Sequence, residues 1–172
     1  MKESRIMADV AEAIICCDQL LQQHGLWEQG WRTRIDRAKT RAGCCRYTRR
    51  TISLSAPIIE LNSWQETLDT IRHEVAHALV GPGHAHDHVW QEMAVRLGAV
   101  PKACCTSRTP EARYLLFCRR CGALIRKYHR LPRIDFSNRY ASCCGRVATG
   151  ELQLFESSMV RPGSSDMRQD QQ

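Results

Sequence analysis

The chain has 172 residues, enough to bury one sizeable core and too few for two large domains, so we expect one compact domain with a small appendage. Its 25 Lys and Arg residues exceed its 18 Asp and Glu residues, which gives a formal net charge of +7. No apolar run approaches the roughly 20 residues of a membrane-spanning helix, and the charged N-terminal segment is unlike a secretory signal. We therefore expect a cytoplasmic protein without a membrane partner, in which cysteines serve as metal ligands or small buried side chains.

Helices and short strands follow one another along the first two thirds of the sequence. Apolar residues at helical spacing predict helices over about 4–24, 64–80 and 87–97, and alternating polar and apolar residues predict strands over 31–36 and 51–55. Glycines end all three helices, at Gly25, Gly81 and Gly98. The expected fold class is therefore α+β, with a short sheet between helices.

Differences in composition divide the rest of the sequence, from residue 101 onward, into a linker, a module and a tail. Residues 101–110 have the composition of a linker, and a cysteine-containing module follows it. The last residues have little apolar surface to bury and are expected to be disordered. We predict a main domain over 1–105, a small metal-binding module over 106–155 and a disordered tail over 156–172.

The string His73-Glu74-Val75-Ala76-His77 lies inside the predicted helix 64–80. Residues four apart lie on one face of a helix, so the two imidazoles can share a cation while Glu74 lies beside it. Catalytic zinc takes three protein ligands, so a third must come from elsewhere. His84, His86 and His88 follow the helix-breaking Gly81-Pro82-Gly83, and each of them could supply it.

This arrangement predicts a zinc-dependent peptidase. Zinc makes its bound water acidic and polarises the scissile carbonyl, and Glu74 then acts as general base and returns the proton to the leaving amine. A bare motif of this kind also occurs by chance in a helix with a structural histidine pair. The histidine-rich segment after the glycines favours the catalytic interpretation.

The cysteines of the module predict a second zinc site. Cys118 and Cys121 have the spacing of a zinc knuckle, and the adjacent Cys143 and Cys144 follow about 20 residues later, as in a zinc ribbon. Cys118, Cys121 and Cys144 are the expected ligands, and the fourth is Cys143 or His129. A redox pair or unrelated buried cysteines are the alternative interpretation.

The positive charge is concentrated in two stretches. Eight Lys or Arg residues lie between Arg32 and Arg50, and eight more between Arg119 and Arg146, with a single acidic residue in each stretch. Such clustering favours a polyanionic partner, most often nucleic acid bound without sequence preference. A solvated basic face without a partner is the alternative.

The sequence resembles the SprT-like (Spartan-related) family of zinc metallopeptidases. The resemblance is carried by IRHEVAHALVGPGHAHDHVW at 71–90, by DRAKTRAGCCRYTRRTISLS at 36–55 and by the ribbon that follows. It implies His73, His77 and His86 as ligands, because the family's third histidine stands four residues before an aromatic residue, here Trp90. It also implies a zincin-like fold with an active-site helix on a short sheet, followed by a zinc ribbon, and cleavage of proteins crosslinked to DNA, with DNA as activator.

Two features depart from that family. The second cysteine pair lacks the two-residue gap, and the chain lacks a long partner-binding tail. From residues and resemblance together we predict a zinc metalloendopeptidase acting on DNA-associated proteins, located in the cytoplasm and at the nucleoid if DNA is its partner. The alternatives are a DNA-independent metallopeptidase and a DNA-binding zinc protein with a vestigial site. Glu74 argues against the last, because a structural zinc site needs no general base.

Overall fold

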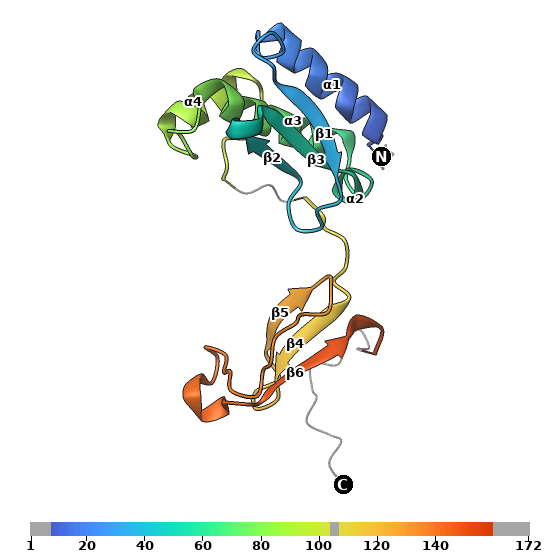
Figure 1. Cartoon of the computed structure of the whole chain (residues 1–172), viewed down its shortest axis with the longest axis vertical. Helices are drawn as coiled ribbons and strands as arrows, with labels where there is room; N and C mark the ends of the chain where they lie inside the picture. The colour runs from blue at the N-terminus through green and yellow to red at the C-terminus, as the bar shows by residue number, and fades with distance from the viewer. Residues whose placement is uncertain (1–7, 104–106, 160–172) are drawn as a thin grey trace, which may run out of the picture. The chain divides into compact units, whose positions relative to one another are not determined.

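The structure is a computed structural model that describes residues 8–103 and 107–159. The chain divides into two compact units, with the division between Pro110 and Glu111 (Figure 1). Helices and strands are both present, so the predicted α+β class is confirmed. Among the described residues, no helix combines the length and the hydropathy needed to cross a bilayer.

The described residues of the first unit, 8–103 and 107–110, form four helices and three strands. Its elements are α1 (Val10–Gln23), β1 (Arg32–Asp36), β2 (Gly43–Arg46), the 3₁₀ turn η1 (Tyr47–Arg49), β3 (Thr51–Ser55), α2 (Ala56–Ile59), α3 (Trp64–Val80) and α4 (His88–Arg96). The strands form one sheet in the order β1-β3-β2, in which β1 is parallel and β2 antiparallel to β3. The edge strand β2 was not predicted. Its sequence GCCR has no alternation of polar and apolar residues, so it forms through pairing with β3 rather than through local preference.

The core lies on one face of this sheet. Ile52 and Leu54 of β3 are buried together with apolar residues of α1 and α3, among them Leu21 and Val75. Because alternate side chains of a strand point to opposite faces, Thr51 and Ser53 lie on the other face. Figure 1 shows the sheet alongside α1 and α3. The helix that carries the histidine motif is thus held against β3 by the main core.

Local capping sets the helix boundaries. Helix α1 begins at Val10, later than predicted, because the Asp9 side chain accepts hydrogen bonds from the amides of Ala11 and Glu12. Helix α3 starts with a capping box in which Ser63 and Glu66 satisfy each other's backbone amides. It ends at Gly81, whose φ of +89° is unfavourable for other residues.

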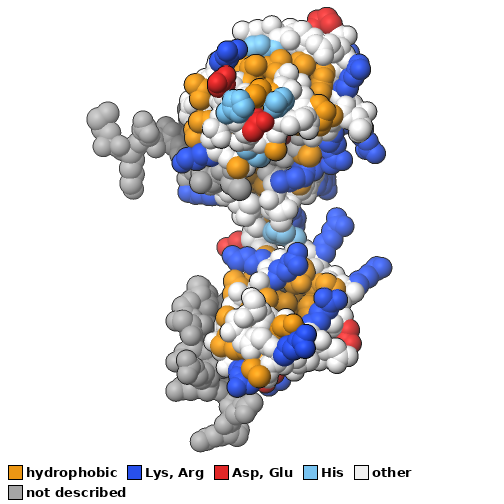
Figure 2. Space-filling model, turned by 90° about the vertical axis from the view of Figure 1, so that its left-hand side faces the viewer, with side chains coloured by type: hydrophobic (Ala, Val, Ile, Leu, Met, Phe, Trp, Pro, Cys, Tyr) orange, Lys and Arg blue, Asp and Glu red, His pale blue; other side chains and the backbone are white. Residues whose placement is uncertain are grey.

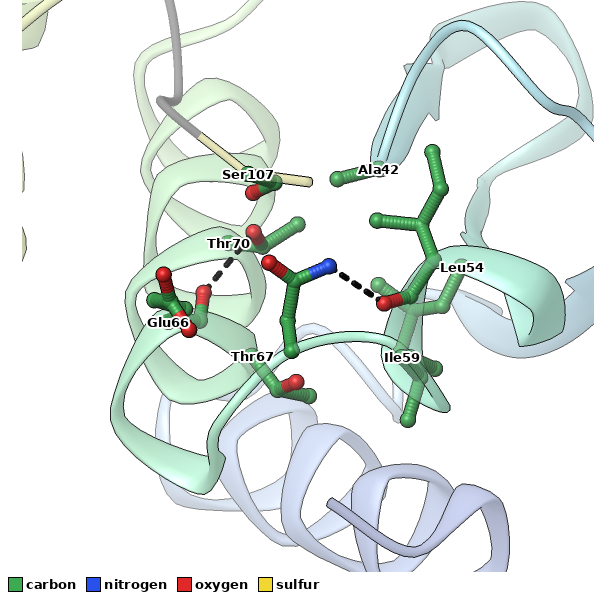
Figure 3. A pocket seen from close by; sticks show the side chains of 9 residues that line it. Ala42, Leu54, Ile59, Glu66, Thr67, Thr70 and Ser107 are labelled. Atoms are coloured by element: carbon green, nitrogen blue, oxygen red, sulfur yellow. Dashed lines mark hydrogen bonds between the residues drawn. The ribbon is translucent and has the colours of Figure 1, made fainter. Parts of the chain in front are cut away.

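Asn62 holds the end of the first unit against its body. Its amide nitrogen donates to the carbonyl oxygens of Ile58 and Arg108, and its amide oxygen accepts from the Arg108 amide at 2.8 Å. The side chain is buried. A cavity of about 10 Å³ lies beside it, lined by Thr67, Thr70 and Ser107 among others (Figure 3). The predicted linker is thus fixed to the first unit at Arg108, whereas its residues 104–106 lie outside the described part of the chain.

The second unit, as far as it is described (111–159), is a three-stranded antiparallel sheet. It contains β4 (Tyr114–Cys118), β5 (Leu124–Tyr128), the 3₁₀ turn η2 (Gly145–Ala148), β6 (Leu152–Glu156) and the 3₁₀ turn η3 (Ser157–Met159), with β4 in the centre. Side chains of β4 are alternately buried and half-buried. Glu156 pairs with Tyr114 and the Ser157 amide donates to the Arg113 carbonyl, so the first residues of the predicted tail are ordered. The rest of that tail, 160–172, lies outside the described residues.

Candidate metal centre and active site

Three histidine side chains meet at the C-terminal half of α3. His73 and His77 lie on one face of that helix, and His86 approaches them from the segment after Gly81. The Nε2 atom of His86 lies 3.2 Å from that of His73 and 3.1 Å from that of His77. Histidine side chains gather on the face of the first unit shown in Figure 2. The chain therefore brings three imidazole nitrogens to one point.

The geometry of these nitrogens fits a tetrahedral metal ion. Two ligands about 2.0 to 2.1 Å from zinc in a tetrahedron are about 3.3 Å apart, close to the separations seen here. Burial, followed by the neighbouring histidines, lowers the pKa of His73 and of His77 to about 4, so both imidazoles are neutral near pH 7 and free to coordinate. The ring of His77 also hydrogen-bonds the backbone of His84, which helps to orient it.

The other two candidate histidines are engaged elsewhere. His84 Nδ1 lies 2.8 Å from a carboxylate oxygen of Asp87, and His88 is exposed at the first position of α4. Asp87 also caps α4 by accepting a hydrogen bond from the Trp90 amide. This cap and the contact between His84 and Asp87 together fix the turn that directs His86, and not its neighbours, toward α3. Gln91 supports the same turn by donating to the His86 carbonyl.

Trp90 forms the apolar wall behind the three histidines. Its side chain is fully buried, and its ring centroid lies 4.6 Å from those of His73 and His86 and 5.1 Å from that of His77. The spacing of four residues between His86 and Trp90 thus corresponds to direct contact. A rigid apolar wall excludes water from the back of the site and holds the imidazoles in place.

Glu74 follows His73 on α3 and is a buried residue, with a relative exposure of 8%. Burial raises its pKa to about 7, although a hydrogen bond from the Cys45 backbone and the charge of Arg41 act in the opposite direction. A carboxyl group with a pKa near neutrality can both accept and release a proton at physiological pH. This property suits a general base that also serves as a general acid.

The edge strand β2 positions Glu74, and the prediction of the site from sequence did not include it. A Cβ atom on Gly43 would lie 2.6 Å from Glu74 Cγ, so only glycine leaves room for this carboxylate. Cys45 supplies the backbone hydrogen bond, and the Tyr47 hydroxyl donates to the His77 carbonyl at 3.3 Å. A glycine inside a short strand marks close approach of another group, and that signal could have identified Gly43.

In the second unit the structure brings four cysteine sulfurs together. Cys118, Cys121, Cys143 and Cys144 have their Sγ atoms within 4.8 Å of one another, and the pair from Cys121 and Cys143 is 3.5 Å apart. A hydrogen bond from the Ala123 backbone, followed by the neighbouring thiols, lowers the pKa of Cys121 to about 7. His129, the alternative fourth ligand, is not part of this group. Four converging thiols form the donor set that zinc prefers in structural sites.

Two turns of the same kind present these cysteines. The Gly122 amide donates to the Cys118 carbonyl, and the Gly145 amide donates to the Ala141 carbonyl, each four residues earlier. Both glycines have positive φ. Ala141 therefore occupies the place in the second turn that Cys118 occupies in the first, and Cys143 brings the fourth sulfur from a different position. This explains how adjacent cysteines can complete the cluster despite the missing two-residue gap.

Among the cysteines that the structure describes, Cys16, Cys17, Cys44 and Cys45 join neither group. Cys17 is fully buried in the core, and Cys45 packs against that core, while Cys16 and Cys44 are half-buried. The pair Cys104-Cys105 lies outside the described residues.

Comparison with known proteins agrees with this geometry. No curated protein and no solved structure matches the chain. The family model described as the SprT-like family matches residues 16–110, which cover more than half of the chain and include all three histidines and Glu74. The chain therefore belongs to the SprT-like family.

Proposed function

We propose that this protein is a zinc-dependent metalloendopeptidase with His73, His77 and His86 as ligands and Glu74 as the catalytic base. One observation carries the proposal: three imidazole nitrogens converge on one point, and the residue next to the first of these histidines on α3, Glu74, is a buried acid. A structural zinc site would take a fourth protein ligand and would have no use for this carboxyl group. Among the described residues, no other His, Cys, Asp or Glu joins the three histidines.

The chemistry follows from the protein's own groups. When bound, zinc would supply Lewis acidity, which polarises a peptide carbonyl and makes a water molecule easier to deprotonate. Glu74 accepts the proton of the attacking water and then delivers it to the leaving amine. Its pKa of about 7 allows both transfers, and the contacts with β2 keep the carboxyl group in one place between them. Trp90 keeps bulk water away from the back of the site.

The two units have separate roles in this proposal. Residues 1–105 form a zincin-like peptidase domain in which α3 is the active-site helix on the short sheet. The second unit, which begins at Glu111, forms a zinc ribbon whose structural zinc is held by Cys118, Cys121, Cys143 and Cys144. The ribbon is supported by the convergence of the four sulfurs and by the paired turns that present them.

The proposed substrates are DNA-associated or DNA-crosslinked proteins. Support comes from the net charge of +7 and from the exposed side chains of the stretch from Arg119 to Arg146, in which all eight basic residues are exposed. Phosphate contacts from such side chains are independent of sequence and sensitive to salt. The enzyme would then work in the cytoplasm, at the nucleoid. A DNA-independent metallopeptidase is the second candidate, and the same experiment separates the two.

The experiment compares the wild-type protein with Glu74→Gln and with the control Glu92→Gln, which neutralises an exposed carboxylate on α4. Each protein is incubated with a DNA-binding substrate protein, with and without DNA. We expect cleavage by the wild type and the control, stimulated by DNA, and none by Glu74→Gln. Equal cleavage by all three proteins would exclude the proposed base. Cleavage that DNA leaves unchanged would support the DNA-independent alternative.

A further inference from the structure

The face of the first sheet that points away from the core carries a hollow of about 560 Å³. We call it the arginine hollow, because Arg34 of β1, Arg46 of β2 and Arg49 of η1 line it. Its floor includes Thr51 and Ser53 of the central strand β3. In the sheet register Arg34 lies opposite Ser53 and Arg46 lies opposite Thr51. Arginines from both outer strands therefore flank a floor of short hydroxyl side chains.

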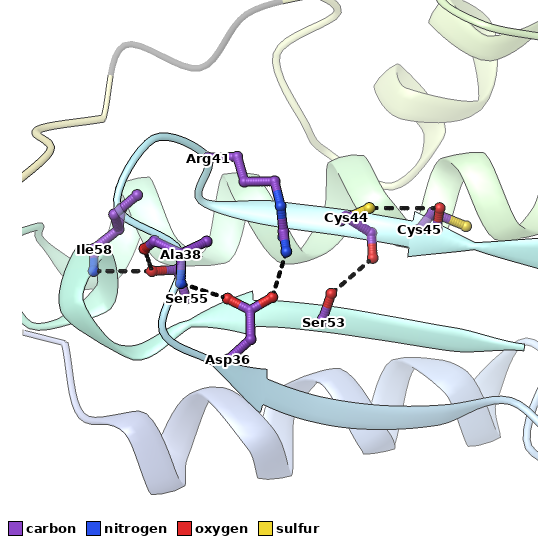
Figure 4. A network of polar contacts seen from close by, with 8 residues as sticks. All are labelled: Asp36, Ala38, Arg41, Cys44, Cys45, Ser53, Ser55 and Ile58. Atoms are coloured by element: carbon purple, nitrogen blue, oxygen red, sulfur yellow. Dashed lines mark hydrogen bonds and ion pairs between the residues drawn. The ribbon is translucent and has the colours of Figure 1, made fainter. Parts of the chain in front are cut away.

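The floor is neutral, and its hydroxyl groups already form hydrogen bonds within the protein. Thr51 Oγ1 donates to the Arg49 carbonyl at 2.9 Å, and Ser53 Oγ donates to the Cys44 carbonyl at 3.4 Å. Asp36 is the one acidic residue of the lining. It forms an ion pair with Arg41 at 2.5 Å and accepts the Ala38 amide, as Figure 4 shows. These contacts lower the pKa of Asp36 against the opposing effect of its burial, so it stays ionised and paired.

The structure separates six of the seven arginines of the first basic stretch into two groups, and the seventh, Arg37, lies outside the hollow. Arg32 donates to the carbonyls of Trp27 and Trp31, Arg41 pairs with Asp36, and Arg50 donates to the Gln29 carbonyl. These three side chains hold the fold together. By contrast, Arg34, Arg46 and Arg49 are exposed, and none of their side chains has a hydrogen bond or ion pair with another residue of ranges 8–103 and 107–159. The arginine hollow therefore presents three guanidinium groups without counter-charges.

We propose that the arginine hollow binds the phosphodiester backbone of nucleic acid. The inference rests on the proposed function, in which the substrates are DNA-associated proteins, and it assigns the contact to one surface of the peptidase unit. Guanidinium groups match phosphate oxygens with two parallel hydrogen bonds. Because the arginines come from both edges of a three-stranded sheet, about 10 Å apart by strand spacing, successive phosphates of one strand can reach both edges.

An acidic peptide is the competing partner, and the observations favour it less. Its carboxylates stand on flexible side chains whose ordering costs entropy, whereas phosphates are part of the backbone of the nucleic acid. The hydroxyl groups of the floor already donate to backbone carbonyls of the protein, so they are not available as donors to nucleic-acid bases. Binding at the arginine hollow is therefore independent of sequence.

The test uses the full chain and a matched pair of double variants. Arg34→Gln with Arg46→Gln removes two charges from the arginine hollow, and Arg37→Gln with Lys39→Gln removes two exposed charges from the same stretch outside it. Fluorescence anisotropy measures binding of a short labelled DNA, single-stranded and duplex, at several salt concentrations. The arginine pair should weaken binding about tenfold at moderate salt and reduce the salt slope by about 1.4 for single strands. The control pair should change binding less than about twofold.

Four outcomes would overturn the inference. Equal losses for the two pairs would show that net charge, and not the arginine hollow, determines binding. Polyglutamate that competes as well as DNA of equal charge would assign the surface to an acidic peptide. If the wild-type protein has no affinity for DNA, this inference fails together with the DNA half of the proposed function. If the wild type binds DNA and the double variant Arg34→Gln/Arg46→Gln binds it equally well, this inference fails alone. Both pairs should cleave a DNA-free protein substrate at the wild-type rate, which shows that the zinc site is intact.

Discussion

Gly43 and Glu74 are so close that a single added carbon on the glycine would lie 2.6 Å from Cγ of the glutamate and 2.9 Å from one of its carboxylate oxygens. The strand that carries Gly43 is the edge strand β2, and the helix that carries Glu74 is α3. A backbone hydrogen bond from Cys45, two residues further along β2, holds the same carboxyl group. The proposed catalytic base is thus positioned by a strand that contributes no side chain to the three-histidine group.

Gly43→Ala should therefore inactivate the peptidase without removing zinc. The new methyl group displaces the Glu74 carboxylate, and misplacement by about 1 Å can cost about 100-fold in rate. Activity on a protein substrate and zinc content per chain measure the two effects. Gly83→Ala is the control, since nothing lies within 4 Å of its added carbon. Loss of zinc together with activity would mean that Gly43 supports the whole site instead of the base.

Glu74→Gln should make the metal-free protein more stable at pH 8. The folded-state pKa of Glu74 is raised from 4.5 to about 7 by burial, so its contribution to stability is present below pH 4.5 and is lost as pH rises through 7. Glutamine keeps the shape without the charge and should gain on the order of 2 kcal/mol above pH 7 relative to pH 4.5. Urea unfolding at both pH values measures the difference. A gain that is equal at the two pH values would contradict the assigned burial cost.

Cys143→Ser should lower the zinc content by about one ion per chain and unfold the second unit, because structural zinc supplies the folding free energy of such small modules. His129→Ala should leave both unchanged, since His129 stands outside the four-sulfur group. Metal analysis and circular dichroism provide the measurements. Cys44→Ser is a thiol control, because Cys44 lies in β2 and joins no metal group. Zinc retained by Cys143→Ser and lost by His129→Ala would reverse the assignment of the fourth ligand.

Asn62→Ala should destabilise the first unit by about 2 to 3 kcal/mol, because it leaves buried backbone groups of Ile58 and Arg108 without partners. Denaturant unfolding of the full chain measures the loss. Limited proteolysis should also cut near Arg108 faster, since that segment is no longer held. Asn138→Ala, at an exposed position, should have little effect on either measurement. An unchanged cutting rate would show that other contacts hold the segment.

Much of the first unit could be predicted from local patterns. Helices α3 and α4 were expected close to their observed bounds, because apolar spacing and capping residues such as Ser63 and Gly81 act within a few residues of the chain. Strand β3 was expected for the same reason. The pattern failed at β2, whose pairing with β3 is a contact between separate segments, and at the start of α1, where the Asp9 cap overrides apolar periodicity.

The site divides in the same way. The sequence by itself determined that His73 and His77 share a helix face with Glu74 beside them, because helical periodicity is a local property. Tertiary structure alone decided the rest. Residue spacing left His84, His86 and His88 open; family resemblance favoured His86, and the structure brings that residue to the other two through the Asp87 cap and the buried Trp90. The place of Glu74 against Gly43 and the separation of structural from unpaired arginines likewise arise from contacts between elements far apart in the chain. A local pattern can mark Gly43 as a site of close approach, but it does not identify Glu74 as the partner, nor does it separate the two groups of arginines.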